Sequence, residues 1–294
     1  EELSLNIEQN AFSGSGITSI ELPKRTSKLG TSIFNGCKNL TSVTFENGYA
    51  CKTITSSMFA GCTALAEITI PGNVNTIERS AFSGCEKLVT VTFGLASADQ
   101  PSNITVIEAD VFKNCTALEN LRYAMKNEVT GEVVYENNAL PESLTTLGAS
   151  NSYHSGPFTN CTSLVELKLP TNVTILSKSL FNGCTKLESV TLPAMLKEIE
   201  QDAFKGSAIS KLDFSTYEDH ALTIYEGAFT NCEKLTALNL KKVGTLYLYK
   251  TFEGCSALQS LEFDSAIVLN GKKGYSSTYY YSGFEKSGVK EVTY

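Results

Sequence analysis

The sequence predicts an α/β repeat solenoid of about 11 coils, and three observations carry this prediction. A Phe returns about every 23 residues, the same short word surrounds each copy, and an alternating apolar segment follows it. Self-similarity at a fixed period is the sequence signature of stacked repeats. A single coil cannot bury its own apolar side, so neighbouring coils must stack into a continuous core. The eleven copies are Phe12, Phe34, Phe59, Phe82, Phe112, Phe158, Phe181, Phe204, Phe229, Phe252 and Phe284.

Each position of the repeated word has a physical role. An Ile or Leu five residues before the Phe predicts a short helical turn or bend that buries both side chains. Gly or Asn two residues after the Phe, as at Asn114, tolerates positive φ and predicts the left-handed residue that ends this turn. Lys286 is the exception at this position. The next segment, for example Leu40, Val43 and Phe45, alternates as a strand does. We therefore expect one strand of a parallel sheet per coil, joined by short helical or irregular turns.

A single domain over residues 1–294 is expected, with insertions at about 123–157 and 264–283. The two Phe copies that flank the first insertion are 46 residues apart, which is two periods, yet only one degenerate coil fits there, at residues 140–147. Alternation around Thr130-Gly131 predicts a projecting β-hairpin in the same insertion.

Composition and charge exclude several classes of protein. Asp and Glu total 31 against 24 Lys and Arg, which gives a net charge of -7. An acidic chain without a basic stripe does not fit the wrapping of nucleic acid or docking on an anionic membrane. No run of 18 apolar residues occurs, so no membrane insertion is expected within this chain. The first residues do not have the pattern of a signal peptide.

The nine cysteines predict packing rather than chemistry. Eight lie three residues after a repeat Phe, one per coil, whereas zinc sites need ligands paired a few residues apart. We therefore expect a ladder of small buried thiols, without disulfides, metal or cofactor. Cys51 lies off the pattern and is expected to be an exposed thiol. The eight in-register residues are Cys37, Cys62, Cys85, Cys115, Cys161, Cys184, Cys232 and Cys255.

No catalytic set is recognisable, so the chain is not expected to be an enzyme. His154 and His220 fall in irregular segments and are expected to be residues of surface loops. The outward strand face carries no His beside a Ser or Cys nucleophile, an arrangement that nucleophilic catalysis requires. No pair of carboxylates stands out for acid–base work either.

The second insertion supplies the first group of candidate ligand-binding residues. Nine of the thirteen Tyr lie in the last third of the chain, and rings with a polar tip favour recognition surfaces. We expect this insertion to carry more binding energy than the strands. Its candidate residues are Lys272, Lys273, Tyr275, Tyr280 and Tyr281.

The outward strand positions supply the second group. They are mostly Ser and Thr, and their charged members Glu166, Lys168 and Lys211 are the candidate contacts. Other tyrosines replace the Ile or Leu five residues before a Phe and are expected to be packed, namely Tyr153, Tyr247 and Tyr279.

The segment from Phe181 to Pro193, FNGCTKLESVTLP, resembles the BspA-type leucine-rich repeats of bacterial surface proteins, also called the Treponema pallidum type. Its Phe, Gly or Asn, Cys and Leu recur together over nearly the whole chain. The resemblance implies a right-handed leucine-rich-repeat superhelix and an extracellular or bacterial cell-surface location. It also implies a non-enzymatic module that binds a protein or glycan, in adhesion or host interaction. The alternative is a structural spacer within a larger cell-surface protein.

Overall fold

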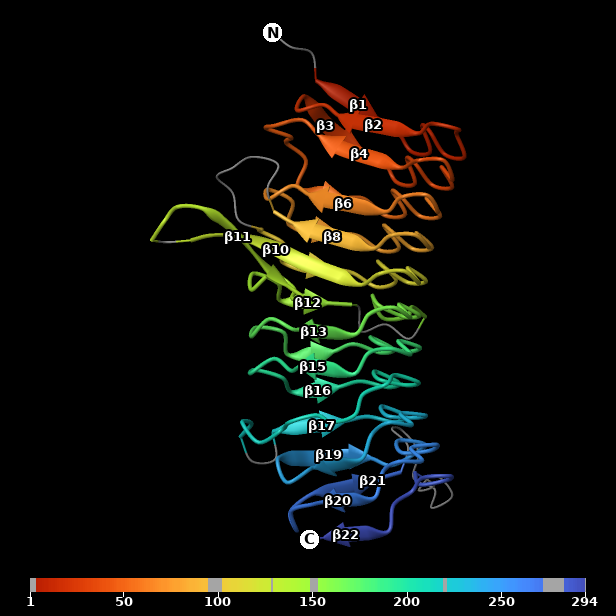
Figure 1. The fold of residues 1–294 in the computed structure, drawn as a ribbon, viewed down its shortest axis with the longest axis vertical. Helices are drawn as coiled ribbons and strands as arrows, with labels where there is room; N and C mark the ends of the chain where they lie inside the picture. Colours follow the sequence, from red (N-terminus) through yellow and green to blue (C-terminus); the bar gives the residue numbers. More distant parts are fainter. Residues whose placement is uncertain are drawn as a thin grey trace.

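The computed structural model describes residues 4–94, 102–127, 129–148, 153–218, 221–271 and 283–293. These residues form a rod of stacked coils with the two termini at opposite ends (Figure 1). The predicted stack of about 11 coils is confirmed. The predicted contacts of the second insertion lie outside the described residues, as do Tyr279 and His220; these contacts are Lys272, Lys273, Tyr275, Tyr280 and Tyr281.

Most coils contribute strands to two parallel sheets. The first sheet takes the strand that follows the Phe, and the second sheet takes a shorter strand that precedes the Phe. The first-sheet strands are β2 (Ser19–Leu22), β4 (Ser42–Phe45), β6 (Glu67–Ile70), β8 (Thr90–Phe93), β10 (Asn120–Lys126), β11 (Val133–Asn137), β13 (Glu166–Lys168), β15 (Ser189–Thr191), β18 (Ala237–Asn239), β20 (Ser260–Glu262) and β22 (Glu291–Thr293). The second-sheet strands are β1 (Leu5–Ile7), β3 (Thr26–Leu29), β5 (Thr53–Ile54), β7 (Thr76–Ile77), β9 (Val106–Ile107), β12 (Thr146–Leu147), β14 (Ile175–Leu176), β16 (Glu198–Ile199), β17 (Leu222–Ile224), β19 (Val243–Tyr247) and β21 (Val268–Asn270).

The α/β part of the prediction is wrong, because the described residues contain no helix. The Ile expected to share a helical turn with the Phe, such as Ile77, lies instead in a second-sheet strand. We call the turn around each repeat Phe the Phe turn. In most coils it holds two left-handed residues: the predicted one, two positions after the Phe, and a second one, two positions before the Phe. Ser32 and Gly36, on either side of Phe34, have φ of 55° and 71°, and even Lys286 has φ of 58°. Left-handed residues cannot continue a right-handed helix, so the chain bends twice.

The repeat Phe residues form a continuous column, which we call the Phe spine. From Phe12 to Phe284 each ring stacks on the next, with centroids 5.4 to 5.9 Å apart. Between these two ends every ring of the spine is fully buried. Adjacent Phe turns also bond through their backbones, as where Phe34 N donates to Met58 O at 2.9 Å. Each such stacked pair contributes about 0.5–1.5 kcal/mol beyond the burial of its area.

The ladder of buried thiols is confirmed. All eight in-register cysteines are free and buried. Each thiol donates to the carbonyl oxygen of the Phe one coil earlier, with Sγ–O distances of 2.9 to 3.2 Å. Burial raises the pKa of Cys62 and of Cys184 to about 12, which leaves them as unreactive thiols at neutral pH.

The projecting hairpin is confirmed as well. β10 and β11 pair antiparallel over five residues of each strand and extend away from the rod (Figure 1). The separate coil expected at residues 140–147 is wrong, because Phe112 stacks directly on Phe158 at 5.6 Å. These residues instead complete the Phe112 coil through β12, which pairs with β9. The long gap between the two Phe is therefore one coil that carries a hairpin.

Two tyrosines expected to fill a core slot do not occupy it. Leu147 takes the buried strand position near Tyr153, whose side chain is 92 % exposed. Leu246 is the residue in register with the preceding coil, and Tyr247 is half-buried and stacks on Tyr225 at 5.2 Å. In both coils a leucine that lies farther than five residues before the Phe occupies the buried strand position. The prediction failed because it assumed a constant spacing of five residues between that position and the Phe.

The expectation of one strand per coil is wrong, because most coils contribute two. Both sheets are also interrupted at two places where the Phe spine continues. At the first interruption β4 and β6 do not share a sheet, and neither do β3 and β5. The second interruption lies between the Phe112 and Phe158 coils, where β12 and β14 belong to different sheets. A further gap between β15 and β18 affects the first sheet alone.

Candidate functional site

The strand residues predicted to bind a ligand do not form one site. Glu166 and Lys168 lie two residues apart on β13. Lys211 is exposed two coils away, in the gap between β15 and β18 where residues 209–214 form no strand. Glu166 already accepts a hydrogen bond from Asn138 Nδ2 at 2.6 Å.

Lys168 holds the hairpin against the next coil. Its Nζ lies 2.6 Å from Glu136 Oε1 and 3.6 Å from Glu142 Oε1. Tyr123 OH donates to Glu136 Oε2 at 2.8 Å. The hydrogen bond from Lys168 is the main cause that lowers the pKa of Glu136, and the same bond raises the pKa of Lys168. The structure therefore gives Lys168 a structural role within the chain.

A groove of about 620 Å³ opens at the first interruption, on the side of the first sheet. Its walls are β4 and β6, which lie visibly farther apart than β6 and β8 (Figure 1). The groove lies between the Phe34 coil, which has 25 residues, and the Phe59 coil, which has 23. The two coils stay together at the Phe turns and separate at the strands.

The groove exposes main-chain groups that are bonded elsewhere in the sheet. Residues of a parallel strand direct their N–H and C=O groups alternately to the two neighbouring strands. Alternate residues of β4 and β6 bond to β2 and β8. Val43 and Phe45 consequently face β6, and Glu67 and Thr69 face β4, without a hydrogen bond between the two strands.

Arg122 gives this groove a cation. From β10 its Nε donates to Thr92 Oγ1 at 2.9 Å, and its guanidinium carbon lies 4.9 Å from the centre of the Tyr135 ring. The sheet register aligns Arg122 with Thr92 and Thr92 with Thr69, so the side chain reaches along this row to the groove that it lines. Within the described part of the chain the guanidinium has no carboxylate partner.

The second-sheet side of the first interruption is closed by side chains. Cys51 Sγ donates to Thr26 O at 3.2 Å, and Thr55 Oγ1 donates to Gly30 O at 2.7 Å. The expectation of an exposed thiol at Cys51 is wrong, since the residue is half-buried and burial raises the pKa of its thiol. The hydroxyls of Thr26 and Tyr49 are buried here without a hydrogen-bond partner. Side chains thus replace the missing strand pairing imperfectly.

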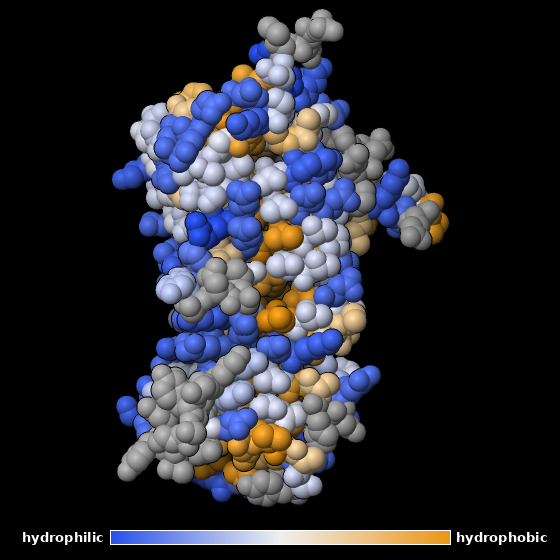
Figure 2. Space-filling view, turned by 180° about the vertical axis from the view of Figure 1, so that it is seen from behind, coloured by the Kyte–Doolittle hydropathy of each residue, from blue (hydrophilic) through white to orange (hydrophobic). Residues whose placement is uncertain are grey.

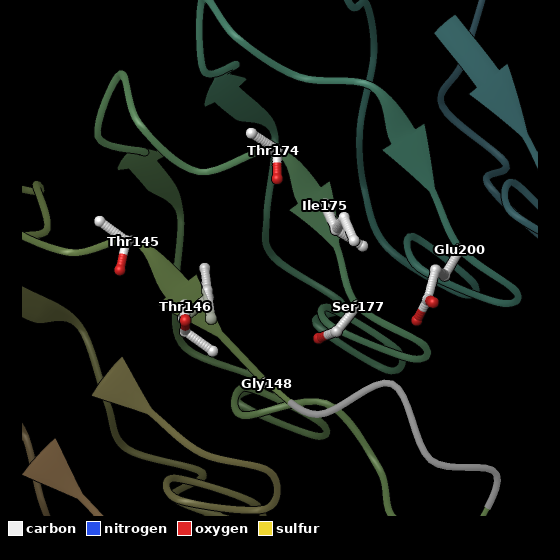
Figure 3. Close-up of a pocket in the computed structure, with 8 residues that line it drawn as sticks. Thr145, Thr146, Gly148, Thr174, Ile175, Ser177 and Glu200 are labelled. Atoms are coloured by element: carbon white, nitrogen blue, oxygen red, sulfur yellow. The ribbon is translucent and has the colours of Figure 1, made fainter. Parts of the chain in front are cut away.

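A smaller notch of about 190 Å³ lies at the second interruption, on the second-sheet side. Figure 3 shows Thr145 and Thr146 on one wall and Thr174, Ile175 and Ser177 on the other. The hydroxyl of Ser177 is buried without a hydrogen-bond partner. Its small size makes the notch a weaker candidate site than the groove.

His154 lies in an irregular segment, as expected, but it is not a free loop residue. Its Nδ1 is 3.3 Å from Asp110 Oδ2 and its Nε2 is 2.8 Å from an Nη atom of Arg79. Lys113 Nζ lies 3.2 Å from the other oxygen of Asp110. His154 and Lys113 thus both contact the buried carboxylate of Asp110, and Arg79 contacts the other ring nitrogen of His154.

Two further observations bear on function. Across the described ranges, no cluster of three or more His, Cys, Asp or Glu side chains could hold a metal ion. The same residues include no helix with the length and apolar character needed to cross a membrane.

Stacked coils with a Phe spine, a thiol ladder and parallel strands define a repeat solenoid whose described part has no recognisable catalytic centre. The chain belongs to the family described as the BspA type leucine rich repeat region, which matches in 6 copies over residues 4–119, 94–213 and 151–282. The resemblance predicted from the repeated word is confirmed.

Solved structures of bacterial proteins share the fold. One is a leucine-rich repeat protein from Bacteroides ovatus, with 22% identity and a TM-score of 0.67, matched over 97% of this chain and 69% of that chain. Another is the pneumococcal vaccine antigen PcpA, with 18% identity and a TM-score of 0.53 over 89% of this chain and 61% of that one. A leucine-rich repeat protein from Eubacterium ventriosum has 18% identity and a TM-score of 0.50 over 98% and 65%. No curated protein matches the chain.

Proposed function

We propose that this chain is a non-enzymatic interaction module of a bacterial surface or secreted protein, and that it binds a protein or glycan in adhesion or host interaction. Membership of the BspA-type family supports this proposal. One structural relative is described as a vaccine antigen, which fits a protein that is accessible from outside the cell. Repeat solenoids present extended surfaces on a rigid support and use them for binding.

The groove at the first interruption is the observation that carries the proposal. Its volume of about 620 Å³ falls within the range of ligand-binding sites, roughly 300–1,000 Å³. Its walls carry unpaired main-chain groups and a guanidinium without a carboxylate partner among the described residues, whereas neighbouring coils satisfy these groups internally. The face opposite to that of Figure 1 shows hydrophobic side chains in its described part as small separate patches (Figure 2), which favours the polar groove as the site.

The alternative function is a structural spacer within a larger surface protein. The Phe spine favours it, because the rings remain stacked across both interruptions, at 5.5 Å and 5.6 Å. A spacer needs this spine but does not need an open groove. Filling the groove should therefore abolish the function of an interaction module and leave that of a spacer unchanged.

The test is a binding screen of the immobilised chain against a glycan array and purified extracellular-matrix proteins. Thr69→Trp fills the groove from the outward face of β6, and Thr191→Trp is the matched control at the same register position of β15. We expect a ligand that binds the unaltered chain and the control but not Thr69→Trp. A screen without any ligand favours the spacer, and a ligand insensitive to Thr69→Trp excludes the groove.

A further inference from the structure

The groove at the first interruption has the hydroxyl and charge pattern of a site for an acidic sugar, an inference that rests on the proposed interaction function. We propose that it binds a carboxylate-bearing saccharide, which lies across the outer face of β4 and β6 with its carboxylate against Arg122. The partner is thus a glycan that contains an acidic sugar, either a uronic acid or a sialic acid.

The spacing of the two walls excludes an inserted strand and admits hydroxyl groups. Cα atoms of β4 and β6 approach within 8 Å of each other, whereas a strand between them would hold them about 9.6 Å apart, twice the usual spacing. A hydroxyl oxygen bonded to both facing edges widens the usual spacing by one hydrogen-bond length, to about 7.6 Å. The facing main-chain groups, which make no hydrogen bond between the two strands, therefore match the hydroxyls of a sugar and not a peptide backbone.

The residues that line the groove offer hydroxyl groups and no exposed apolar anchor. The hydroxyl-bearing lining residues are Thr41, Ser42, Thr44, Thr69 and Thr92. The apolar lining residues Val43 and Ile68 are buried, and Phe45 packs half-buried against the core. Interfaces between proteins centre instead on apolar and aromatic residues that fill pockets of the partner. A sugar matches this lining better, because hydroxyl groups both donate and accept hydrogen bonds.

Arg122 supplies the end of the groove that attracts an anion. Its Nε donates to Thr92 Oγ1 and its guanidinium packs over the Tyr135 ring, so the side chain is held in place before a ligand binds. It is the one cation among the described residues that line the groove, and its Nη atoms supply the donors for a charge-assisted, two-bond contact with a carboxylate. A chain with a net charge of -7 as a whole repels anions, so the binding of an acidic saccharide depends on this side chain.

Glu67 supplies a hydrogen-bond acceptor at the other end of the groove. It stands two residues before Thr69 on β6, about 6.6 Å along the strand. Thr69 itself lies in the row of Thr92 and Arg122. An acidic sugar carries its carboxylate and several of its hydroxyls at opposite ends of the ring, so the carboxylate meets Arg122 while a hydroxyl donates to Glu67. A neutral sugar lacks the first contact, and a carboxylate without hydroxyls lacks the second.

The experiment measures the binding of defined saccharides by isothermal titration calorimetry. The probes are tri-galacturonic acid, 3′-sialyllactose and every other acidic member of the glycan array, so that uronic and sialic acids are distinguished. The control for each probe is its methyl ester, which keeps the hydroxyls and lacks the charge. We expect an acidic probe to bind and its ester to bind about tenfold more weakly, because the ester loses the charge-assisted pair. This comparison does not depend on the folding of any protein variant.

Protein variants assign the binding to the groove. Arg122→Gln should abolish the difference between acid and ester, and the matched control Arg25→Gln, at an exposed corner before β3, should keep it. Arg122→Lys should restore part of the difference, because it keeps the charge but not the planar fork of donors. Binding of the ester, which does not use the charge, reports that each variant is folded.

Four outcomes overturn the inference. Equal binding of acid and ester excludes the carboxylate contact, and an acid preference that survives in Arg122→Gln excludes this groove. A chain that binds no acidic saccharide but captures a neutral glycan or an extracellular-matrix protein refutes the acidic-sugar site and leaves the proposed function standing. A chain that binds nothing in either screen refutes both.

Discussion

The two interruptions of the solenoid are mirror cases of the same defect. At the first, the first-sheet side is open as a groove, and the thiol of Cys51 and the hydroxyl of Thr55 bridge the second-sheet side. At the second, the first-sheet side is bridged, because Lys168 N donates to Asn138 O and Leu140 N donates to Lys168 O. There the second-sheet side stays open as the notch beside Ser177.

The spine and the sheets are therefore independent supports of the stack. The first defect lies beside the 25-residue Phe34 coil, and the second lies beside the coil that carries the hairpin. At both interruptions the Phe turns remain stacked, and one of the two sheet sides is bridged by hydrogen bonds. Side chains supply these bonds at the first interruption, and the main chain that follows the hairpin supplies them at the second. The unrepaired side is where a pocket forms. All three buried hydroxyls without a partner in the described residues, those of Thr26, Tyr49 and Ser177, lie at these defects.

The largest effect is expected from removing the spine where the sheets do not assist it. Phe59→Ala and Phe181→Ala should each lower the free energy of unfolding by about 3–5 kcal/mol, the usual range for a buried Phe. Phe59→Ala should in addition give residues 4–45 a separate unfolding transition, because no strand pairing joins them to the Phe59 coil. Denaturant unfolding monitored by hydrogen exchange checks this. A single transition for Phe59→Ala would contradict the independence of spine and sheets.

The next largest effects are two changes of opposite sign in the free energy of unfolding, both from substitutions at the first interruption. Thr55→Val removes the hydroxyl that bonds to Gly30 O and should lower the free energy of unfolding by about 1–2 kcal/mol. Thr26→Val removes a buried hydroxyl without a partner and should raise it by about 1 kcal/mol. The two substitutions have the same shape change, so each is the control of the other in thermal unfolding. Equal signs would mean that side chains do not repair this side of the defect.

A smaller effect is expected at the second interruption. Lys168→Met should lower the free energy of unfolding by about 0.5–1 kcal/mol at neutral pH, because the ion pairs are partly exposed and screened. The folded state lowers the pKa of Glu136, so this contribution is present above the ordinary pKa of Glu, near 4.3, and is lost as the pH falls through the lowered value. The difference between Lys168→Met and the parent chain should therefore disappear on acidification. Lys24→Met, whose ion pair with Glu46 lies away from the hairpin, is the control.

The smallest effect is a difference in the rate of thiol labelling. The eight in-register thiols should react with a thiol reagent only after unfolding, because they are buried in the core. Cys51 is half-buried at the first interruption and should react first when the coils there open locally. Mass spectrometry of the labelled native chain gives the order. Labelling of Cys85 before Cys51 would place the weakest contact between coils elsewhere.

The sequence by itself determined the features that recur in every coil. The Phe spine, the thiol ladder and the left-handed residue after each Phe could be predicted, because each depends on one residue type at a fixed offset. The hairpin around Thr130-Gly131 was also predictable, since its alternation and turn are local. Of the candidate site, the charged strand residues Glu166, Lys168 and Lys211 were visible, but their contacts were not, because the partners of Lys168 lie 26 and 32 residues away.

The tertiary structure alone decided where the sheets stop. The groove lies between a 25-residue coil and a 23-residue coil, and the fit of one coil to the next is a relation between neighbours that no single repeat contains. The change in spacing was a signal for it, and so was Pro71, which stands where an N–H would otherwise donate across to Phe45 O. The second strand of each coil was missed for a similar reason: two residues such as Thr76 and Ile77 are too short to show a pattern and become a strand only when the neighbouring coils supply their hydrogen bonds.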